Sequence, residues 1–187
     1  DGGWFPGALF EQYAAQWDLR SRLLRLAQPV MEDLGEATGE TINLGIALAG
    51  SVVQVALNNS TYFLGSRNWV GVDLPAHTSS LGKVFYAHGV LDEPEGPLER
   101  LTPHTAGSWT ELADQLATVR EQGYAATVDE LEVGLTGIGA PVWFDGTVVA
   151  ALGLSGPSTR LADRIPAVGR VVAAHADRLT ARLSTKR

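Results

Sequence analysis

Apolar residues near the start of the chain recur at helical spacing in two successive groups. The first group covers residues 10–17 and the second covers residues 23–34. Side chains three or four positions apart lie on one face of a helix. We therefore expect two helices, with Ser21 as the cap of the second, a kink at Pro29, and an end near Gly39.

Strict alternation of apolar residues follows, which predicts a half-buried strand. Ile42, Leu44, Ile46 and Leu48 alternate with other residues, and a turn at 49–51 leads into a second alternating run at 53–57. Period-two alternation indicates one buried face of a sheet. The two runs therefore predict a hairpin, and residues 62–72 predict one or two further short strands.

The second half of the chain mixes helical and strand patterns. Residues 79–88 and 109–122 have helical spacing, with Ser108 and Gly123 as end signals for the second helix. Residues 90–107 read as a loop with at most a short helix. Two apolar runs, 133–144 and 147–155, flank Asp145-Gly146, which is typical of a tight hairpin turn. A final helix carries an apolar stripe from Val168 to Leu183. The fold class predicted is α+β with a mainly antiparallel sheet.

Composition and charge exclude several classes. The chain has 187 residues, a formal net charge of −7 and no cysteine, so it offers no disulfide or thiolate chemistry. Lysine occurs only at Lys83 and Lys186, which is too few basic residues for a nucleic-acid surface. No run reaches the roughly 18–20 apolar residues that span a bilayer. We expect a cytoplasmic protein whose N-terminus here begins abruptly, as if a further domain precedes it.

The histidines are weak candidates for chemistry. His88 and His175 fall on apolar helix faces and are expected to pack in the core. His104 has no neighbouring histidine for zinc. His77 lies close to several hydroxyls, but no base-orienting group or oxyanion hole is evident. The acidic residues at 129–132 could hold a divalent cation, although a solvated loop is the simpler interpretation. We expect no catalytic residue, no metal and no cofactor.

One feature suits ligand binding. The helix predicted at 79–88 begins with Thr78, Ser79 and Ser80, and a helix start offers unpaired N–H groups to an anion. The small residues at 137, 139, 153 and 155 could leave a cavity over the sheet. Alternatively, the hydroxyls only cap the helix and the glycines only relieve crowding. The residues alone leave both interpretations open.

Three stretches carry a resemblance to a known family. They are, in chain order, LPAHTSSLGKVFYA, TPHTAGSWTELADQLATVREQGYAATVDELEVGL and APVWFDGTVVAALGLSGPSTRL. A fourth similar stretch precedes them, LAQPVMEDLGEATGETINLGIA. Together they resemble the effector-binding domain of the IclR regulator family, over roughly residues 23–183. The resemblance implies a GAF/PAS-like curved antiparallel sheet of about six strands flanked by helices. It also implies an N-terminal winged helix-turn-helix domain before Asp1, followed by a linker helix in residues 1–20 and an effector-binding domain in residues 21–187. The protein is then expected to form a homodimer or homotetramer.

The resemblance also implies effector-binding positions, one at a time. They are the turn before Gly-Lys, the acidic pair before the long strand, and positions in the last two strands. These residues are Thr78, Ser79, Ser80, Leu81, Asp129, Glu130, Leu135, Gly137, Gly153 and Ser155. The chain departs from the family at Thr127, where an acid is usual nearby, at Thr136, where Arg is usual, and at Gly137, which is often Cys. The departures suggest a roomier and less polar pocket.

The expected hairpin register raises a difficulty for this site. A two-residue turn at Asp145-Gly146 would pair Ile138 with Gly153, which places Gly137 on the opposite face. Both glycines can line one pocket only if a bulge intervenes. Pro141 cannot donate a ladder hydrogen bond, so we predict the bulge there.

The expected function is a sensor that performs no reaction. It binds a small organic acid, with aromatic acids included, and controls DNA binding by the preceding domain. Trp4, Phe5, Phe10 and Trp17 are expected to serve dimer packing. Two alternatives stay open: a stand-alone GAF-type signalling module, and a hydrolase built on His77 and a nearby serine.

Overall fold

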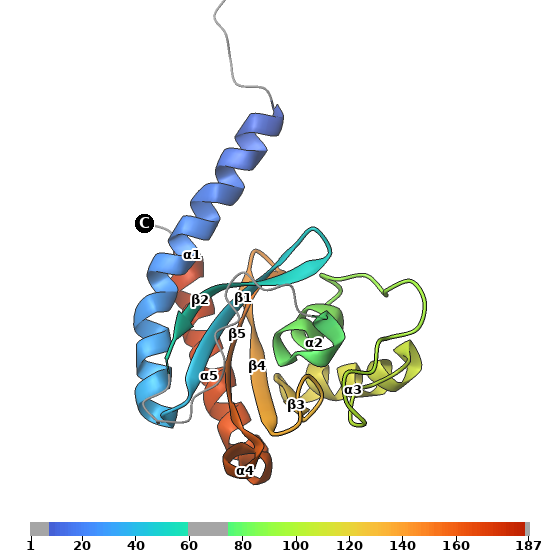
Figure 1. Ribbon diagram of the computed structural model, residues 1–187. Helices are drawn as coiled ribbons and strands as arrows, with labels where there is room; N and C mark the ends of the chain where they lie inside the picture. Colours follow the sequence, from blue (N-terminus) through green and yellow to red (C-terminus); the bar gives the residue numbers. More distant parts are fainter. Residues whose placement is uncertain (1–7, 60–74, 186–187) are drawn as a thin grey trace, which may run out of the picture.

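The fold is a five-stranded antiparallel sheet between two helical layers. The computed structural model describes residues 8–59 and 75–185, with side chains described from Asp18. The strand order is β2-β1-β5-β4-β3 (Figure 1). The strands are β1 (Thr41–Leu48), β2 (Ser51–Asn58), β3 (Ala125–Val128), β4 (Leu135–Phe144) and β5 (Thr147–Pro157). The α+β prediction is confirmed, with five strands in the described residues. The short strands expected at residues 62–72 lie outside the described residues.

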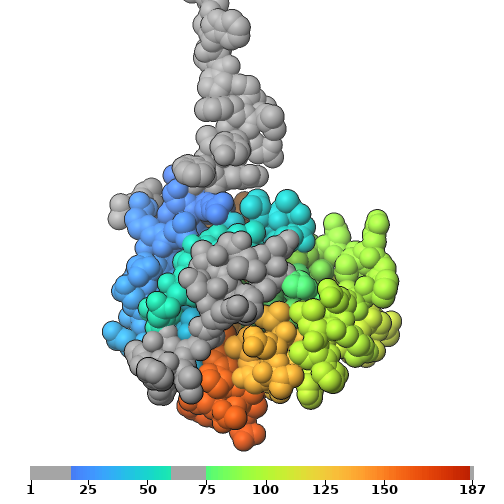
Figure 2. Space-filling model, in the orientation of Figure 1, coloured from blue at the N-terminus to red at the C-terminus, as the bar shows by residue number. Residues whose placement is uncertain are grey.

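The helices divide between the two faces of the sheet. On one face lie α1 (Ala8–Thr38) and α5 (Ile165–Ser184), and on the other lie α2 (Ser80–Ala87) and α3 (Trp109–Gln122). Each pair packs against its own apolar cluster, so the sheet is buried on both sides. The space-filling view in Figure 2 shows α1 and the α2–α3 segment on opposite sides of the molecule. Two short helices, α4 (Ser158–Leu161) and η2 (Ala162–Arg164), connect β5 to α5, and η1 (Ala76–Thr78) precedes α2.

Both predicted hairpin turns are confirmed. Ala49 and Gly50 have φ angles of 50° and 82°, and Asp145 and Gly146 have φ angles of 50° and 75°. A turn with two successive positive φ angles matches the twist of antiparallel strands. Glycine is favoured in such turns because it adopts a positive φ angle without steric cost. The turns therefore place β2 beside β1 at one edge of the sheet and β4 beside β5 within it.

The expectation of two N-terminal helices is wrong. One helix, α1, runs without a break through Ser21 and Pro29 and ends at Thr38. Leu23, Ala27, Val30 and Leu34 are buried in the core cluster that α1 shares with α5. This packing outweighs the local cost of Pro29 and of a capping residue inside a helix. The helix crosses the predicted boundary between residues 20 and 21, and that division stays a prediction.

The later helices follow their sequence signals, with one exception. Ser79 and Ser108 accept hydrogen bonds from the amides of Gly82 and Glu111, and Gly123 ends α3 with a φ of 79°. In α5 the buried stripe is Val168, Val172, Ala176, Leu179 and Leu183. Val171 is 36% exposed and His175 is only partly buried, so their expected core positions are wrong.

The β4–β5 ladder contains a bulge, but not at the predicted residue. Pro141 pairs regularly with Ala151, and the register shifts between Val142 and Trp143. The shift pairs Gly137 with Ser155 and Gly139 with Gly153. The four small residues therefore share one face of the sheet, as a ligand cavity over them requires.

Candidate functional site

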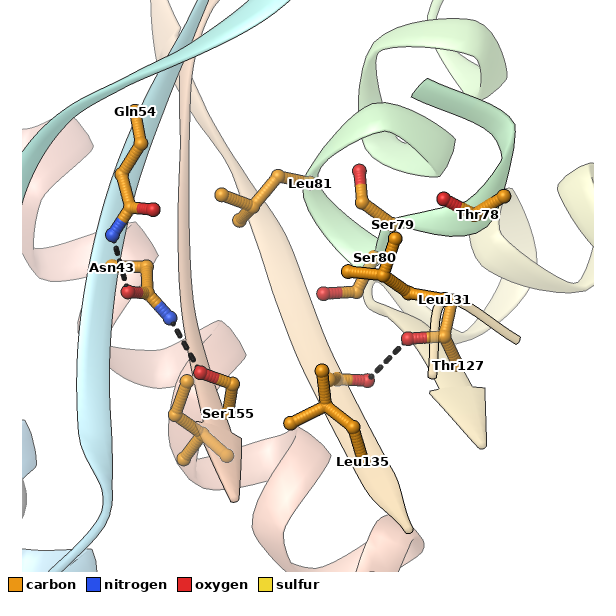
Figure 3. Close-up of a pocket in the computed structure, with 12 residues that line it drawn as sticks. Asn43, Gln54, Thr78, Ser79, Ser80, Leu81, Thr127, Leu131, Leu135 and Ser155 are labelled. Atoms are coloured by element: carbon orange, nitrogen blue, oxygen red, sulfur yellow. Dashed lines mark hydrogen bonds between the residues drawn. The ribbon is translucent and has the colours of Figure 1, made fainter. Parts of the chain in front are cut away.

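A pocket of about 60 Å³ lies between the sheet and the start of α2. Figure 3 shows its side chains converging from the strands on one side and from α2 on the other. The lining residues are Asn43, Gln54, Thr78, Ser79, Ser80, Leu81, Thr127, Leu131, Leu135, Gly137, Leu154 and Ser155. None of these residues carries a charge at neutral pH, so the described part of the lining offers a ligand amides, hydroxyls and apolar groups.

Most of the residues predicted to bind an effector line this pocket. They are Thr78, Ser79, Ser80, Leu81, Leu135, Gly137 and Ser155. The structure brings them together through the β4–β5 bulge and the η1–α2 junction. Asp129, Glu130 and Gly153 are not among the lining residues. That the lining residues bind an effector stays a prediction.

The hydroxyls at the start of α2 have different roles. Ser79 caps the helix by accepting from the Gly82 amide at 3.0 Å, and the Thr78 hydroxyl donates to the Pro75 carbonyl at 2.8 Å. These two are therefore engaged in the local backbone. Ser80 is 5% exposed, and no hydrogen bond of its hydroxyl is found within the described part of the chain. Ser80 is the hydroxyl at this helix start that remains available to a ligand.

A chain of polar side chains forms the opposite wall. Gln54 donates to the Asn43 side-chain oxygen, and Asn43 donates to the Ser155 hydroxyl at 2.9 Å (Figure 3). All three residues are buried. Asn43 and Gln54 are not among the site residues predicted from the sequence. The only available signal was an amide side chain inside an otherwise apolar strand, because buried polar side chains need partners.

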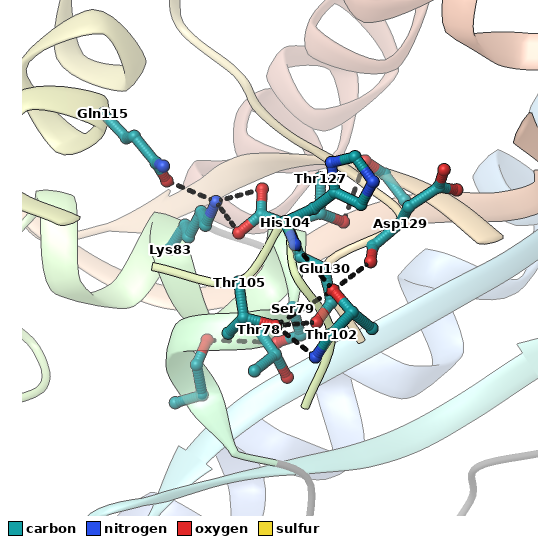
Figure 4. A network of polar contacts seen from close by, with 12 residues as sticks. Thr78, Ser79, Lys83, Thr102, His104, Thr105, Gln115, Thr127, Asp129 and Glu130 are labelled. Atoms are coloured by element: carbon teal, nitrogen blue, oxygen red, sulfur yellow. Dashed lines mark hydrogen bonds and ion pairs between the residues drawn. The ribbon is translucent and has the colours of Figure 1, made fainter. Parts of the chain in front are cut away.

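Glu130 is held by a lysine instead of facing the pocket. Its two carboxylate oxygens accept from Lys83 Nζ at 2.6 Å, and Lys83 also donates to Gln115 on α3 at 2.5 Å (Figure 4). Burial lowers the pKa of Lys83 and raises the pKa of Glu130, and the opposite charge of each partner counters both effects. Lys83 is 1% exposed, so this pair is a structural ion pair between α2 and the β3–β4 loop, and the predicted ligand role of Glu130 lacks geometric support.

The Asp129 carboxylate also has a structural role, because it forms hydrogen bonds within the protein. Its φ is 59°, and its side chain accepts from the Gly134 amide at 2.9 Å and from the Ser158 hydroxyl at 2.5 Å. The Ser158 hydrogen bond, followed by that from Gly134, lowers the pKa of Asp129. The carboxylate therefore shapes the β3–β4 loop and joins it to α4, away from the pocket lining.

Among the residues whose side chains are described, the histidines and acids do not converge on a reaction centre. His77 Nε2 lies 2.8 Å from the Glu99 carbonyl oxygen, and no histidine–serine hydrogen bond occurs among residues 18–59 and 75–185. His88 Nε2 is buried without a hydrogen-bond partner, and burial lowers the pKa of this side chain. No cluster of three metal-ligating side chains occurs within the described residues. In the same residues, no helix is long and apolar enough to cross a membrane.

The chain matches one protein family over most of its length. Residues 17–181 match the family model described as the C-terminal domain of the bacterial transcriptional regulator IclR. The HTH-type transcriptional regulator KdgR of Dickeya chrysanthemi is 38% identical over 148 residues, covering 75% of this chain and 48% of that protein. The HTH-type transcriptional repressor AllR of Escherichia coli is 30% identical over 178 residues, covering 91% of this chain and 66% of that protein. The chain thus spans about half to two-thirds of these relatives.

Solved structures have the same fold. The C-terminal domain of the E. coli transcriptional regulator KdgR superposes with a TM-score of 0.74 at 29% identity, covering 88% of this chain and 99% of that one. An IclR homolog from Microbacterium hydrocarbonoxydans, solved in complex with 4-hydroxybenzoate, superposes with a TM-score of 0.73 at 26% identity. It covers 86% of this chain and 68% of that one. The resemblance noted in the sequence is confirmed, and the chain belongs to the C-terminal domain family of IclR-type bacterial transcriptional regulators.

Proposed function

We propose that this chain is the effector-sensing and oligomerising part of an IclR-type regulator, and that its effector is a small organic acid. The observation that carries the proposal is the pocket at the start of α2, which joins a free hydroxyl at Ser80 to a buried amide chain at Asn43. A carboxylate can accept hydrogen bonds from both sides of this pocket. The complex of an IclR homolog with 4-hydroxybenzoate supports an acid as ligand.

The binding mode follows from the neutral lining. A carboxylate that leaves water needs several hydrogen-bond donors in place of its hydration shell. The first amides of α2, the Ser80 hydroxyl and the Asn43 amide are such donors, and the helix dipole adds a favourable field. The apolar part of the acid packs against Leu135 and Leu131.

Regulation of DNA binding requires a DNA-binding domain and an oligomer that can adopt more than one arrangement of its subunits. We propose that a winged helix-turn-helix domain precedes Asp1 and that α1 belongs to the connection. Ligand binding shifts the equilibrium between arrangements of a homodimer or homotetramer, because the acid fits one arrangement better. The spacing between the DNA-binding domains then either matches or does not match the spacing of the two half-sites on the operator DNA.

Calorimetry on the 187-residue chain tests the binding site. Acetate, pyruvate, benzoate and 4-hydroxybenzoate are the probes, and at least one is expected to bind. Ser80→Trp fills the pocket and should weaken that binding at least tenfold, whereas Thr118→Trp, on the exposed face of α3, should leave it unchanged.

The milder variant Ser80→Ala, which keeps the backbone and loses one donor, should weaken binding several-fold. It also serves if Ser80→Trp does not fold. Unchanged affinity in folded Ser80→Trp would place the acid elsewhere, and no binding by any probe would contradict the proposal.

A further inference from the structure

Leu81 covers a floor of three glycines from three neighbouring strands. A Cβ atom built on Gly45 of β1 or on Gly139 of β4 would lie 3.1 Å from a Leu81 methyl group. A Cβ atom built on Gly153 of β5 would lie 2.9 Å from one. The Leu81 side chain therefore occupies space that the sheet leaves empty.

This arrangement explains why Gly153 does not line the pocket. Gly153 lies on the correct face of the sheet, paired with both Gly139 and Asn43, but the Leu81 side chain covers it. Leu81 itself lines the pocket and is only partly buried. The open volume thus ends at Leu81, and the glycine floor continues beneath it as space that a shorter side chain would release.

The size of the pocket limits what it can hold. Its volume is about 60 Å³. An apolar cavity that takes up benzene has a volume of about 150 Å³. With Leu81 in place, the pocket therefore suits an acid with a short aliphatic body, and an aromatic ring requires more space than is open.

We propose that Leu81 is the specificity-determining residue of this pocket: it restricts the effector to short aliphatic carboxylates, of the size of acetate or pyruvate, by filling the space over Gly45, Gly139 and Gly153. The inference rests on the proposed function, in which the pocket binds an organic acid. It differs from that function in predicting which acids bind and which residue decides.

The test compares pyruvate and benzoate as calorimetric probes. The wild-type chain should bind pyruvate at least tenfold more tightly than benzoate. Leu81→Ala should bind benzoate at least tenfold more tightly than the wild type does, because three carbon atoms leave the glycine floor. Leu81→Val, a smaller change, should shift the preference in the same direction and serves if Leu81→Ala does not fold. Leu101→Ala, at a leucine that is 39% exposed, is the control and should change neither affinity.

A second substitution can refill the released space. After Leu81→Ala, a Cβ atom on Gly45 retains only ordinary contacts, with Val52 at 3.4 Å and with Cβ of residue 81 at 3.7 Å. The double variant Leu81→Ala/Gly45→Ala should therefore bind benzoate less tightly than Leu81→Ala. Equal affinity of the wild type for both acids, or an unchanged preference in folded Leu81→Ala, would overturn the inference while leaving the proposed function intact. Failure of the wild type to bind any of the four acids would overturn the proposed function as well.

Discussion

Arg160 of α4 forms a bidentate ion pair with Glu40, one of the two residues that link the end of α1 to β1. The guanidinium Nε and one Nη donate to the two carboxylate oxygens, at 2.5 and 2.6 Å. The Glu40 side chain is 2% exposed and that of Arg160 is 26% exposed. The pair therefore joins two segments 120 residues apart at a point where one partner is fully shielded from water.

Removal of Arg160 should be costly because it leaves a buried carboxylate without its counterion. We expect Arg160→Met to lower the free energy of unfolding by about 3 kcal/mol. Arg178→Met is the matched control, because the Arg178–Asp33 pair between α5 and α1 is about half exposed on both sides and should contribute less than about 1 kcal/mol. Urea unfolding followed by circular dichroism measures the free energy of unfolding of both variants. Equal losses would show that the burial of Glu40 does not determine the contribution of its ion pair to stability.

The Lys83–Glu130 pair predicts opposite pH dependences for its two single variants. In Lys83→Met, burial holds the pKa of Glu130 above its ordinary value of 4.5 without an opposing cation. The folded state then binds the proton more tightly than the unfolded chain, so the free energy of unfolding should fall as pH rises above 4.5. In Glu130→Gln, the pKa of Lys83 lies below 10.5, and the free energy of unfolding should rise as pH rises toward 10.5.

Urea unfolding at pH 5, 7 and 9 measures these slopes. Each single variant should lose about 3–5 kcal/mol near pH 7, whereas the double variant Lys83→Met/Glu130→Gln should recover most of that loss. The same slope in both single variants would contradict the assignment of the buried charges.

A glycine in α2 should reverse the usual effect of alanine in a helix. Alanine normally stabilises a helix by about 1 kcal/mol relative to glycine. A Cβ atom on Gly82, however, would lie 2.0 Å from the Ala76 carbonyl oxygen in η1. Because backbone must move to admit it, Gly82→Ala should destabilise the chain by about 1–3 kcal/mol.

Gly35 in α1 is the matched control. A Cβ atom there approaches only the end of the Asn58 side chain, at 3.2 Å, and the core side chain of Ile42. Gly35→Ala should therefore be neutral or stabilising, by up to about 1 kcal/mol. Thermal unfolding of the two variants gives the comparison, and a stabilised Gly82→Ala would show that η1 shifts freely away from α2.

Elements with strong local signals could be predicted from the sequence. The turn at Asp145-Gly146, the cap at Ser108 and the helix end at Gly123 depend on a few adjacent residues, and the structure confirms them. The break expected at Ser21 was wrong because burial of one face of α1 against α5 decides the length of that helix. Local capping preference contributes too little to override such packing.

The site was predictable to the extent that motif and strand periodicity define it. The motif before Gly-Lys placed Ser80 at the pocket, and the need for a bulge placed Gly137 on the pocket side of β4, although the bulge follows Val142 and is not at Pro141. The roles of Glu130 and Leu81 could not be predicted, because they depend on residues that are distant in the sequence. Lys83 neutralises Glu130 across 47 residues, and Leu81 covers glycines of three strands. Such pairings follow from tertiary packing, which periodicity does not encode.

The length of α1 has a mechanical consequence. The helix spans 31 residues, and its contacts with the core cluster run from Leu19 to Leu34. At a rise of 1.5 Å per residue, Ala8 lies about 40 Å along the axis from Leu34, so a tilt of about ten degrees at the base moves that end by about 7 Å. The helix is a lever: the same tilt moves Leu19, at the far end of the stretch that packs on the core, by about 4 Å, so the tip of the helix (Figure 1) moves nearly twice as far as its packed base.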